Sequence, residues 1–194
     1  MRFWVPSINS FIFPFGLASI TLRDVFLLTG LPMIGPDALC LIDIEDTNLI
    51  KYSAASTDFS SYHSLIQHRV KNTSEPLEKE HVEFLWVLIC KFFICPSSKK
   101  STVEYLHLAR AVASRKFFAL GTILLSLTYR SLNYYHSCCP FLKFGGSLWL
   151  IQLRLFAYFP EIHRSPLQDS HLPIGIQLFS CTSSLGLDDA LAFF

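Results

Sequence analysis

The chain has 194 residues, of which 51% are hydrophobic and 16% charged, and phenylalanine alone occurs 18 times. This composition excludes an intrinsically disordered chain and is at the apolar end of the range for a folded domain. The formal net charge of +1 gives no reason to expect long-range attraction to nucleic acid or anionic lipid. We expect one domain with a tail, because a chain of this length can bury one substantial core.

The apolar runs do not predict a membrane span. The longest uninterrupted run, residues 117–129, has a basic residue at each end and is shorter than the about 20 residues that a span needs. Arg154 interrupts the run that ends at residue 160, and a charge at the centre of a span is costly. The N-terminal segment, broken by prolines, lacks the pattern of a secretory signal. We therefore expect an intracellular protein whose six cysteines are thiols.

The first clear element is a helix from Leu22 to Thr29. Thr21 can cap it through its hydroxyl, and Asp24 can accept a hydrogen bond from the backbone of Thr21 in return. Gly30 suits a left-handed position after the last turn, and Pro32 prevents the helix from continuing. The segment that follows, residues 43–79, is polar and serine-rich and is expected to be a loop with one marginal amphipathic helix around residues 62–70.

Further helices are expected in the centre of the chain. One runs through "HVEFLWVLICKFFIC" and stops at Pro96, and the next begins at Ser101, which forms an S-x-x-E capping box with Glu104. A third covers "LGTILLSLTYRSL", and a fourth begins with Ser147 as its cap and ends at Pro160.

These elements predict an all-α fold, an irregular helical bundle of about five to seven helices with an irregular C-terminal tail. Leu, Ala, Phe and Trp outnumber Val and Thr in the apolar runs, which favours helices over strands. We expect the bundle to span residues 1–162, including the polar loop region, and residues 163–194 to be a poorly ordered tail.

No catalytic, cofactor or metal site is recognisable. A pyridoxal phosphate site needs a Schiff-base lysine near a phosphate-binding loop, and neither Lys91 nor Lys116 follows a Gly/Ser-rich loop. The H-x-E pattern at His81 and Glu83 lacks the P-C-x-x-C element of zinc deaminases. We therefore expect no enzyme activity, no catalytic residue, no cofactor and no metal.

Two alternatives remain open. A basic region from Lys99 to Lys116 could contact nucleic acid, although no known DNA-reading motif is present. Cys138 and Cys139, in a loop near His136, are the best candidates for a reactive thiol in an uncharacterised enzyme.

Arginines within apolar helices need a partner, because an unpaired buried charge is strongly destabilising. The set is Arg110, Arg130 and Arg154, with Asp24 and Glu83 as possible partners. We expect Arg110 or Arg130 to tie the central helices to the helix that carries Asp24.

Five segments occur in an order that resembles the plant mobile domain, the aminotransferase-like domain of the MAINTENANCE OF MERISTEMS-like plant proteins and related transposon-encoded proteins. They are "FPFGLASITLRDVFLLTGLPMIG", "EHVEFLWVLICKFFICPSSKK", "EYLHLARAVA", "LSLTYRSL" and "SLWLIQLRLFAYFPEIH". The residues that fit the family's patterns are Thr21, Leu22, Asp24, Val25, Leu28, Gly30, Leu31, Pro32, Ala109, Arg110, Tyr129, Arg130, Trp149, Gln152, Phe159 and Pro160.

The resemblance implies a helical protein-interaction module in the nucleus, with roles in meristem maintenance and transposon silencing and a phosphatase-like partner. It implies no chemistry for any residue. The chain departs from the family pattern at Arg154, where an aromatic residue is frequent, and Met1 lies close to the first motif. We expect a truncated copy of the domain.

Overall fold

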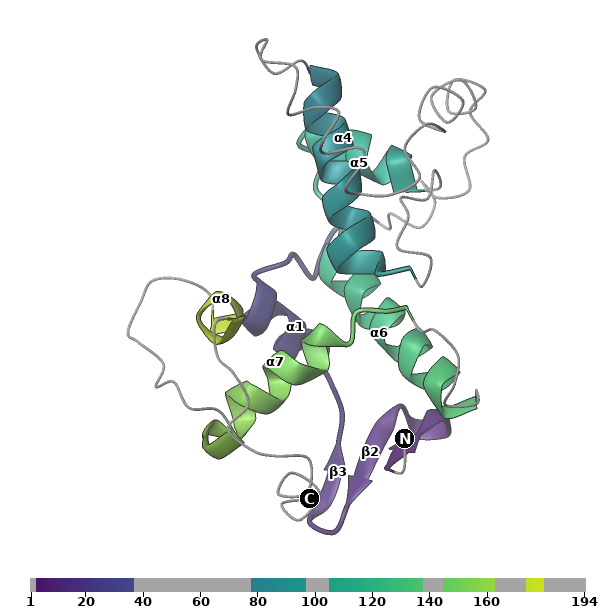
Figure 1. Ribbon diagram of the computed structural model, residues 1–194, viewed down its shortest axis with the longest axis vertical. Helices are drawn as coiled ribbons and strands as arrows, with labels where there is room; N and C mark the ends of the chain where they lie inside the picture. Colours follow the sequence, from purple (N-terminus) through teal and green to yellow (C-terminus); the bar gives the residue numbers. More distant parts are fainter. Residues whose placement is uncertain (1–2, 37–77, 97–104, 138–144, 163–173, 180–194) are drawn as a thin grey trace. The chain divides into compact units, whose positions relative to one another are not determined.

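The computed structural model describes residues 3–36, 78–96, 105–137, 145–162 and 174–179. The chain forms two compact units. The first unit comprises residues 1–33, 120–142 and 147–194, and the second comprises residues 34–119 and 143–146. The elements are mostly helical, as the sequence predicts (Figure 1).

A small antiparallel sheet at the start of the first unit corrects the all-α prediction. Its strands β1 (Trp4–Val5), β2 (Ser10–Phe13) and β3 (Gly16–Ala18) lie in the order β1-β2-β3, with a 3₁₀ turn over Pro6–Ile8 between the first two. Phe11 is opposite both Trp4 and Ala18, and Ile12 is opposite Leu17. Figure 1 shows the strands in purple near the N-terminus.

Backbone geometry explains why this segment is a sheet. Asn9 and Gly16 have φ angles of 45° and 135°, so the chain reverses at both places. The strands between these turns are short and aromatic, and aromatic side chains fit a pleated surface well. Strands of two to four residues are too short for a helical or alternating pattern to be distinguished in the sequence alone.

Helix α1 (Leu22–Thr29) has the predicted bounds and caps. Thr21 and Asp24 form the reciprocal capping box, and Gly30 adopts the left-handed conformation with φ 71°. Val25 and Leu28 are buried on one face of the helix, whereas Phe26 and Leu27 are exposed. The local sequence therefore predicts both ends of this helix correctly.

Helices α6 (Leu120–Ser137) and α7 (Trp149–Tyr158) complete the main framework of the first unit. Gly121 allows α6 to approach the chain after α1, since its N–H donates to the carbonyl of Pro32 over 3.0 Å. Leu148, not the predicted Ser147, holds the N-cap position of α7. The buried apolar side chains of these two helices are Ile123, Leu124, Leu132, Leu150, Leu153 and Phe156.

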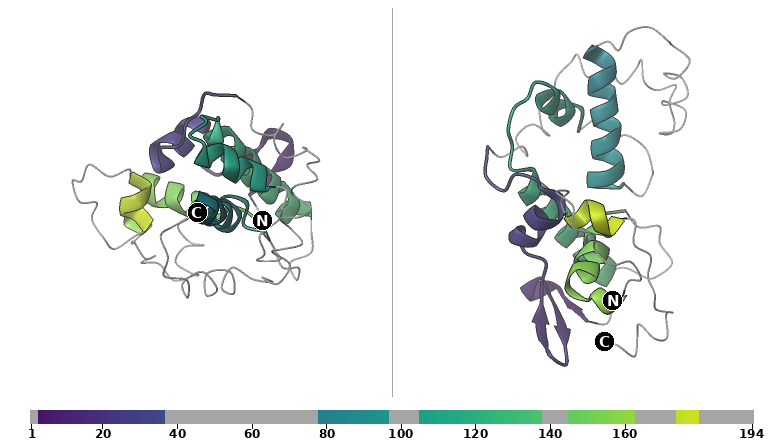
Figure 2. Two further views of the ribbon diagram at one scale, coloured as in Figure 1. Left: turned by 90° about the horizontal axis from the view of Figure 1, so that it is seen from above. Right: turned by 90° about the vertical axis from the view of Figure 1, so that its left-hand side faces the viewer.

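A further helix, α8 (Ile174–Phe179), lies where the sequence shows no sustained pattern. It packs against α1 and α7, and both Figure 1 and Figure 2 show it beside them. Leu178 is fully buried, and the backbone of Gly175 lies so close to Leu28 that an added Cβ would be 1.9 Å from the Leu28 carbonyl oxygen. This part of the expected irregular tail is thus a packed helix.

The second unit is built on α4 (Glu78–Leu88), its π-helical continuation (Ile89–Ile94) and α5 (Leu106–Ala113). The predicted stop before Pro96 is correct, with Cys95 in a left-handed conformation. Helices α4 and α5 pack together, and the buried apolar residues of this unit are Trp86, Val87, Ile89, Cys90, Leu106, Leu108, Ala109, Ala111 and Phe118.

Several expectations fall on residues outside the described ranges. These are the polar region 43–77 with its marginal helix, the capping box of Ser101 and Glu104, the loop cysteines Cys138 and Cys139, and residues 163–173 and 180–194. The division into residues 1–162 and 163–194 stays a prediction. In the described parts of the chain, every helix is too short or too polar to cross a bilayer.

Candidate functional site

The buried carboxylate of Asp24 is the centre of a polar cluster between α1 and α7. Asp24 is 3% exposed, and its Oδ2 accepts hydrogen bonds from the backbone N and the Oγ1 of Thr21, at 2.8 and 2.9 Å. The same oxygen accepts a bond from Nε of Arg154 over 3.1 Å, and Oδ1 accepts one from the hydroxyl of Tyr158 over 2.7 Å. One carboxylate therefore caps α1 and attaches α7 to it.

Arg154 and Tyr158 reach Asp24 together because they are four residues apart on α7 and so share a helix face. The Arg154 guanidinium also lies over the Tyr158 ring, 4.7 Å from its centroid. A planar guanidinium can pair with a carboxylate and stack on an aromatic ring at once, which a lysine ammonium cannot do.

Opposing effects set the ionisation of the cluster. Burial alone would raise the pKa of Asp24, but the hydrogen bonds from Thr21 and Tyr158 and the charge of Arg154 outweigh it and hold the pKa below 3.8. The hydrogen bond to the Asp24 carboxylate, with a smaller contribution from burial, raises the pKa of Tyr158 above 10.0. At neutral pH the carboxylate is charged and the tyrosine hydroxyl is neutral.

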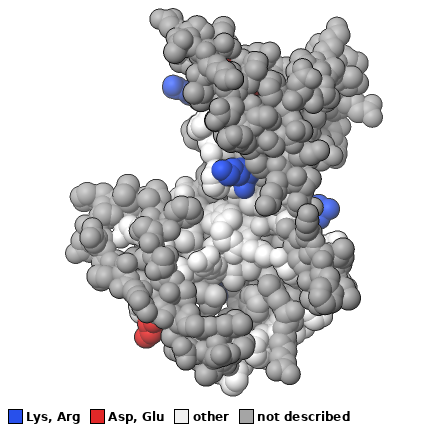
Figure 3. Space-filling model, viewed as in Figure 1, with Lys and Arg blue, Asp and Glu red and all other residues white. Residues whose placement is uncertain are grey.

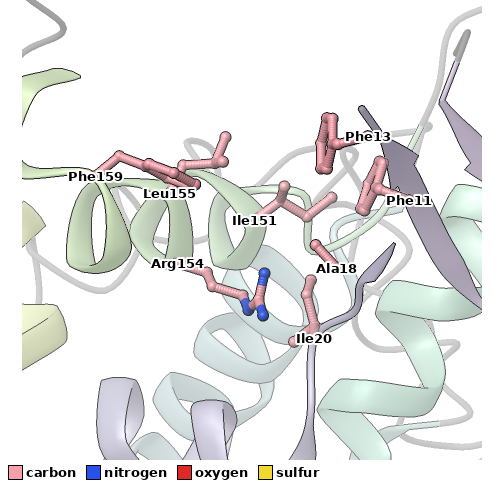
Figure 4. Close-up of a pocket in the computed structure, with 8 residues that line it drawn as sticks. All are labelled: Phe11, Phe13, Ala18, Ile20, Ile151, Arg154, Leu155 and Phe159. Atoms are coloured by element: carbon pink, nitrogen blue, oxygen red, sulfur yellow. The ribbon is translucent and has the colours of Figure 1, made fainter. Parts of the chain in front are cut away.

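Arg154 also borders a small pocket in the first unit, with a volume of about 100 Å³. The pocket lies between the inner face of the sheet and α7, and Figure 4 shows the rings of Phe11 and Phe13 on one side and side chains of α7 on the other. Its lining residues are Phe11, Phe13, Ala18, Ile20, Ile151, Arg154, Leu155 and Phe159. Arg154 is the only ionisable residue of the lining, and its charge is balanced by Asp24.

The structure brings some of the predicted motif residues together. Thr21 and Asp24 of the first motif meet the helix of the last motif through Arg154, and Phe159 lines the pocket. The hydroxyl of Tyr129 on α6 contacts the carbonyl of Ile20 and the hydroxyl of Ser19, so it fixes the chain between β3 and α1.

The remaining motif residues have structural positions. Val25, Leu28 and Ala109 are buried, Gly30 ends α1, Leu22, Leu31, Pro32, Arg110 and Trp149 are half-buried, and Arg130, Gln152 and Pro160 are exposed. We expect Arg110 or Arg130 to reach the helix of Asp24 from the sequence, but the structure pairs Asp24 with Arg154, the third arginine of the set. Arg110 is in the second unit, and its partner stays a prediction. Sequence reasoning missed Tyr158, although its four-residue spacing from Arg154 was a usable signal.

The structure adds little support for the other candidate sites. His81 is exposed and Glu83 is buried, so the H-x-E residues point to different sides of α4. The described residues hold no group of three or more His, Cys, Asp or Glu side chains placed to bind a metal. Arg115 and Lys116 are exposed, and on the face shown in Figure 3 the described Lys and Arg side chains form separate spots.

Comparison with protein families identifies the chain. The sequence model of the plant mobile domain matches residues 1–181, and the chain belongs to this family. The matched region includes the sheet, the Asp24 cluster and α8. No curated protein and no solved structure matches the chain.

Proposed function

We propose that this plant mobile domain is a non-enzymatic protein-interaction module that acts in the nucleus. Its role is in meristem maintenance and transposon silencing, with a phosphatase-like protein as a partner. Membership of the plant mobile domain family is the broad support for this function.

The observation that carries the proposal is an apolar surface on the hairpin of β2 and β3. Ile12 and Leu17 are 47% and 68% exposed and are opposite each other in the sheet, and Phe15, 64% exposed, is in the turn between their strands. Contiguous exposed apolar side chains are typical of protein interaction sites. By contrast, the Asp24 cluster uses its polar groups on one another and supports structure more than chemistry.

An affinity capture with the full chain tests this function. The immobilised chain is exposed to a plant nuclear extract, and bound proteins are identified by mass spectrometry. We expect a phosphatase-like protein to be retained by the native chain and lost with the hairpin variant I12T/L17T. A variant at the exposed residue Ile34, which is outside the sheet, should retain it.

Two parallel measurements separate the alternatives. Salt-dependent retention on DNA or heparin, weakened by R115Q/K116Q, would replace the proposal with a nucleic-acid function. Selective labelling of Cys139 by a thiol-reactive probe, together with turnover of any substrate that is lost in C139S, would replace it with an enzyme function.

A further inference from the structure

Strand β3 pairs with β2 on one side, and no strand in the described ranges pairs with its other side, which is the free edge of the sheet. This free edge adjoins the pocket at Ala18, and the combination identifies the kind of partner segment that the hairpin suits. The N–H of Ile12 donates to the carbonyl of Phe3 over 2.8 Å, so the polar backbone groups of Ile12 face β1. In an antiparallel sheet hydrogen-bonded and non-hydrogen-bonded pairs alternate, and Ile12 is therefore in a non-hydrogen-bonded pair with Leu17. The N–H and C=O of Leu17 consequently point away from β2, toward the free edge.

The two faces of the sheet differ beside this edge. Ile12 and Leu17 are on the outer, exposed face, whereas Phe11, Phe13 and Ala18 line the pocket on the inner face. A strand added along β3 would place one residue opposite Leu17, with its side chain on the outer face. The neighbouring residue of that strand would place its side chain on the inner face, where the pocket lies.

Volume and charge restrict that side chain. A pocket of about 100 Å³ is smaller than the roughly 150 Å³ cavity that holds a benzene ring, so it suits an aliphatic side chain better than an aromatic one. A charged side chain gains nothing there, because the one charged group of the lining already has its counter-ion in Asp24.

We propose that strand β3 binds an extended segment of a partner protein by strand addition, with a Val, Leu or Ile side chain of that segment in the pocket. The backbone groups of Leu17 supply the main-chain hydrogen bonds, and the pocket supplies the side-chain preference. This inference rests on the proposed interaction function and specifies the chemistry of the partner.

Synthetic peptides test the inference with the full chain. The probes are short, fluorescein-labelled, threonine-rich peptides in which one central residue is Gly, Ala, Val, Leu, Phe, Asp or Lys. The affinity measured by fluorescence anisotropy should be highest for the Val or Leu peptide. It should be lower by about tenfold or more for the Gly, Asp and Lys peptides. Equal affinity for all central residues would overturn the inference, and so would the absence of binding.

Backbone methylation of the peptide tests the strand geometry without altering the protein. N-methylation at the residue opposite Leu17 should abolish binding, whereas N-methylation one residue away should leave it within about threefold, because alternate amides face away from β3. A ligand that binds as a helix would not lose affinity at alternate positions. Equal effects of N-methylation at the two positions would therefore also overturn the inference.

Protein variants complete the test. A18L should fill the pocket and L17P should remove the edge N–H, and both should weaken binding by about tenfold or more, while I34T, outside the sheet, keeps it. Circular dichroism checks that each variant is folded. Binding that survives A18L and L17P contradicts strand addition. Self-association of the chain that sedimentation detects and L17P abolishes would show that a second copy, and not a partner protein, occupies β3, and it would also overturn the inference.

The outcomes separate this inference from the proposed function. A nuclear partner that A18L and L17P still capture would leave the interaction function intact and reject the role of β3. Failure to capture any partner, with peptides bound as expected, would reject the proposed function and retain the binding property of the edge.

Discussion

Asp24 combines two tasks that usually fall to different residues. As the third residue of α1 it completes the capping box with Thr21, and as a buried anion it neutralises Arg154 of α7. The first task depends on residues three apart and the second on residues 130 apart in the chain.

Replacement of Asp24 by asparagine should destabilise the chain substantially. The variant D24N leaves Arg154 partly buried without its counter-ion, and we expect a loss of about 3 kcal/mol in the free energy of unfolding. Urea denaturation followed by circular dichroism measures it. The matched control E161Q removes an exposed carboxylate and should change stability by no more than about 0.5 kcal/mol. Equal effects of the two variants would show that the cluster contributes little.

Lowering the pH should remove the stabilising contribution of the Asp24 carboxylate. Because the pKa of Asp24 is lower in the folded chain, its stabilising contribution is complete above the unfolded pKa of about 3.9 and is lost as the pH falls through the folded pKa. The melting temperature of the native chain should therefore decrease when the pH is lowered below about 4. The decrease should be smaller in D24N, which lacks this carboxylate.

The variant Y158F provides a finer test of this pH dependence. It removes the donor to Oδ1 and should raise the pKa of Asp24, so the acid transition should move to higher pH. An acid transition that is identical in the native chain, D24N and Y158F would contradict the assignment.

At the scale of elements, helix α8 shows how tertiary contact can decide secondary structure. Six residues are too few to form a stable helix in isolation. The helix exists because Leu178 is buried and Gly175 permits backbone contact with the end of α1. A glycine in a helix costs stability on its own, and here close packing compensates for it.

The variant G175A should release α8 from α1. An added methyl group would meet a backbone oxygen that cannot move away cheaply, and we expect a loss of about 2 kcal/mol in the free energy of unfolding. Hydrogen exchange should become faster in residues 174–179. The control I174A, at a partly exposed position of the same helix, should change exchange little, and comparable exchange in both variants would contradict the packing role of Gly175.

At the scale of the molecule, the exposed apolar side chains of the described residues include a pair, Ile12 and Leu17, that are direct neighbours across the hairpin. An exposed edge strand presents unpaired backbone groups to other chains, and apolar side chains beside it add to the tendency to associate. The position of this surface at one sheet, with Ile12 and Leu17 side by side, distinguishes it from single exposed apolar residues such as Ile34.

The double variant I12T/L17T should lower the binding of a hydrophobic dye and reduce concentration-dependent association of the chain. Both effects follow from the removal of adjacent apolar surface, and threonine retains the preference for strand conformation. Dye fluorescence and analytical ultracentrifugation measure them. I34T serves as the control, and an equal effect of this single replacement would show that the hairpin has no special property.

Sequence alone located α1, most of the central helices and their proline stops, because caps, prolines and helical periodicity are local features. It identified the family from the order of five motifs. It named Arg154 among three arginines and Asp24 as a possible partner, but it did not connect Phe159 with them. It failed at the sheet and at α8, where elements are short and their stability comes from distant contacts. It favoured Arg110 or Arg130 over Arg154 as the contact to the helix of Asp24, whereas the structure pairs Asp24 with Arg154.

The sequence by itself determined both ends of α1, the stops of two further helices before Pro96 and Pro160, and the family to which the chain belongs. Only the tertiary structure decided which charges pair, that the N-terminal aromatic segment folds into a sheet, and that this sheet and α7 enclose a pocket. The physical reason is the separation along the chain over which each interaction acts. Caps and periodicity act over a few residues, whereas the pairing of Asp24 with Arg154 and the meeting of β2 with α7 depend on how the chain packs as a whole.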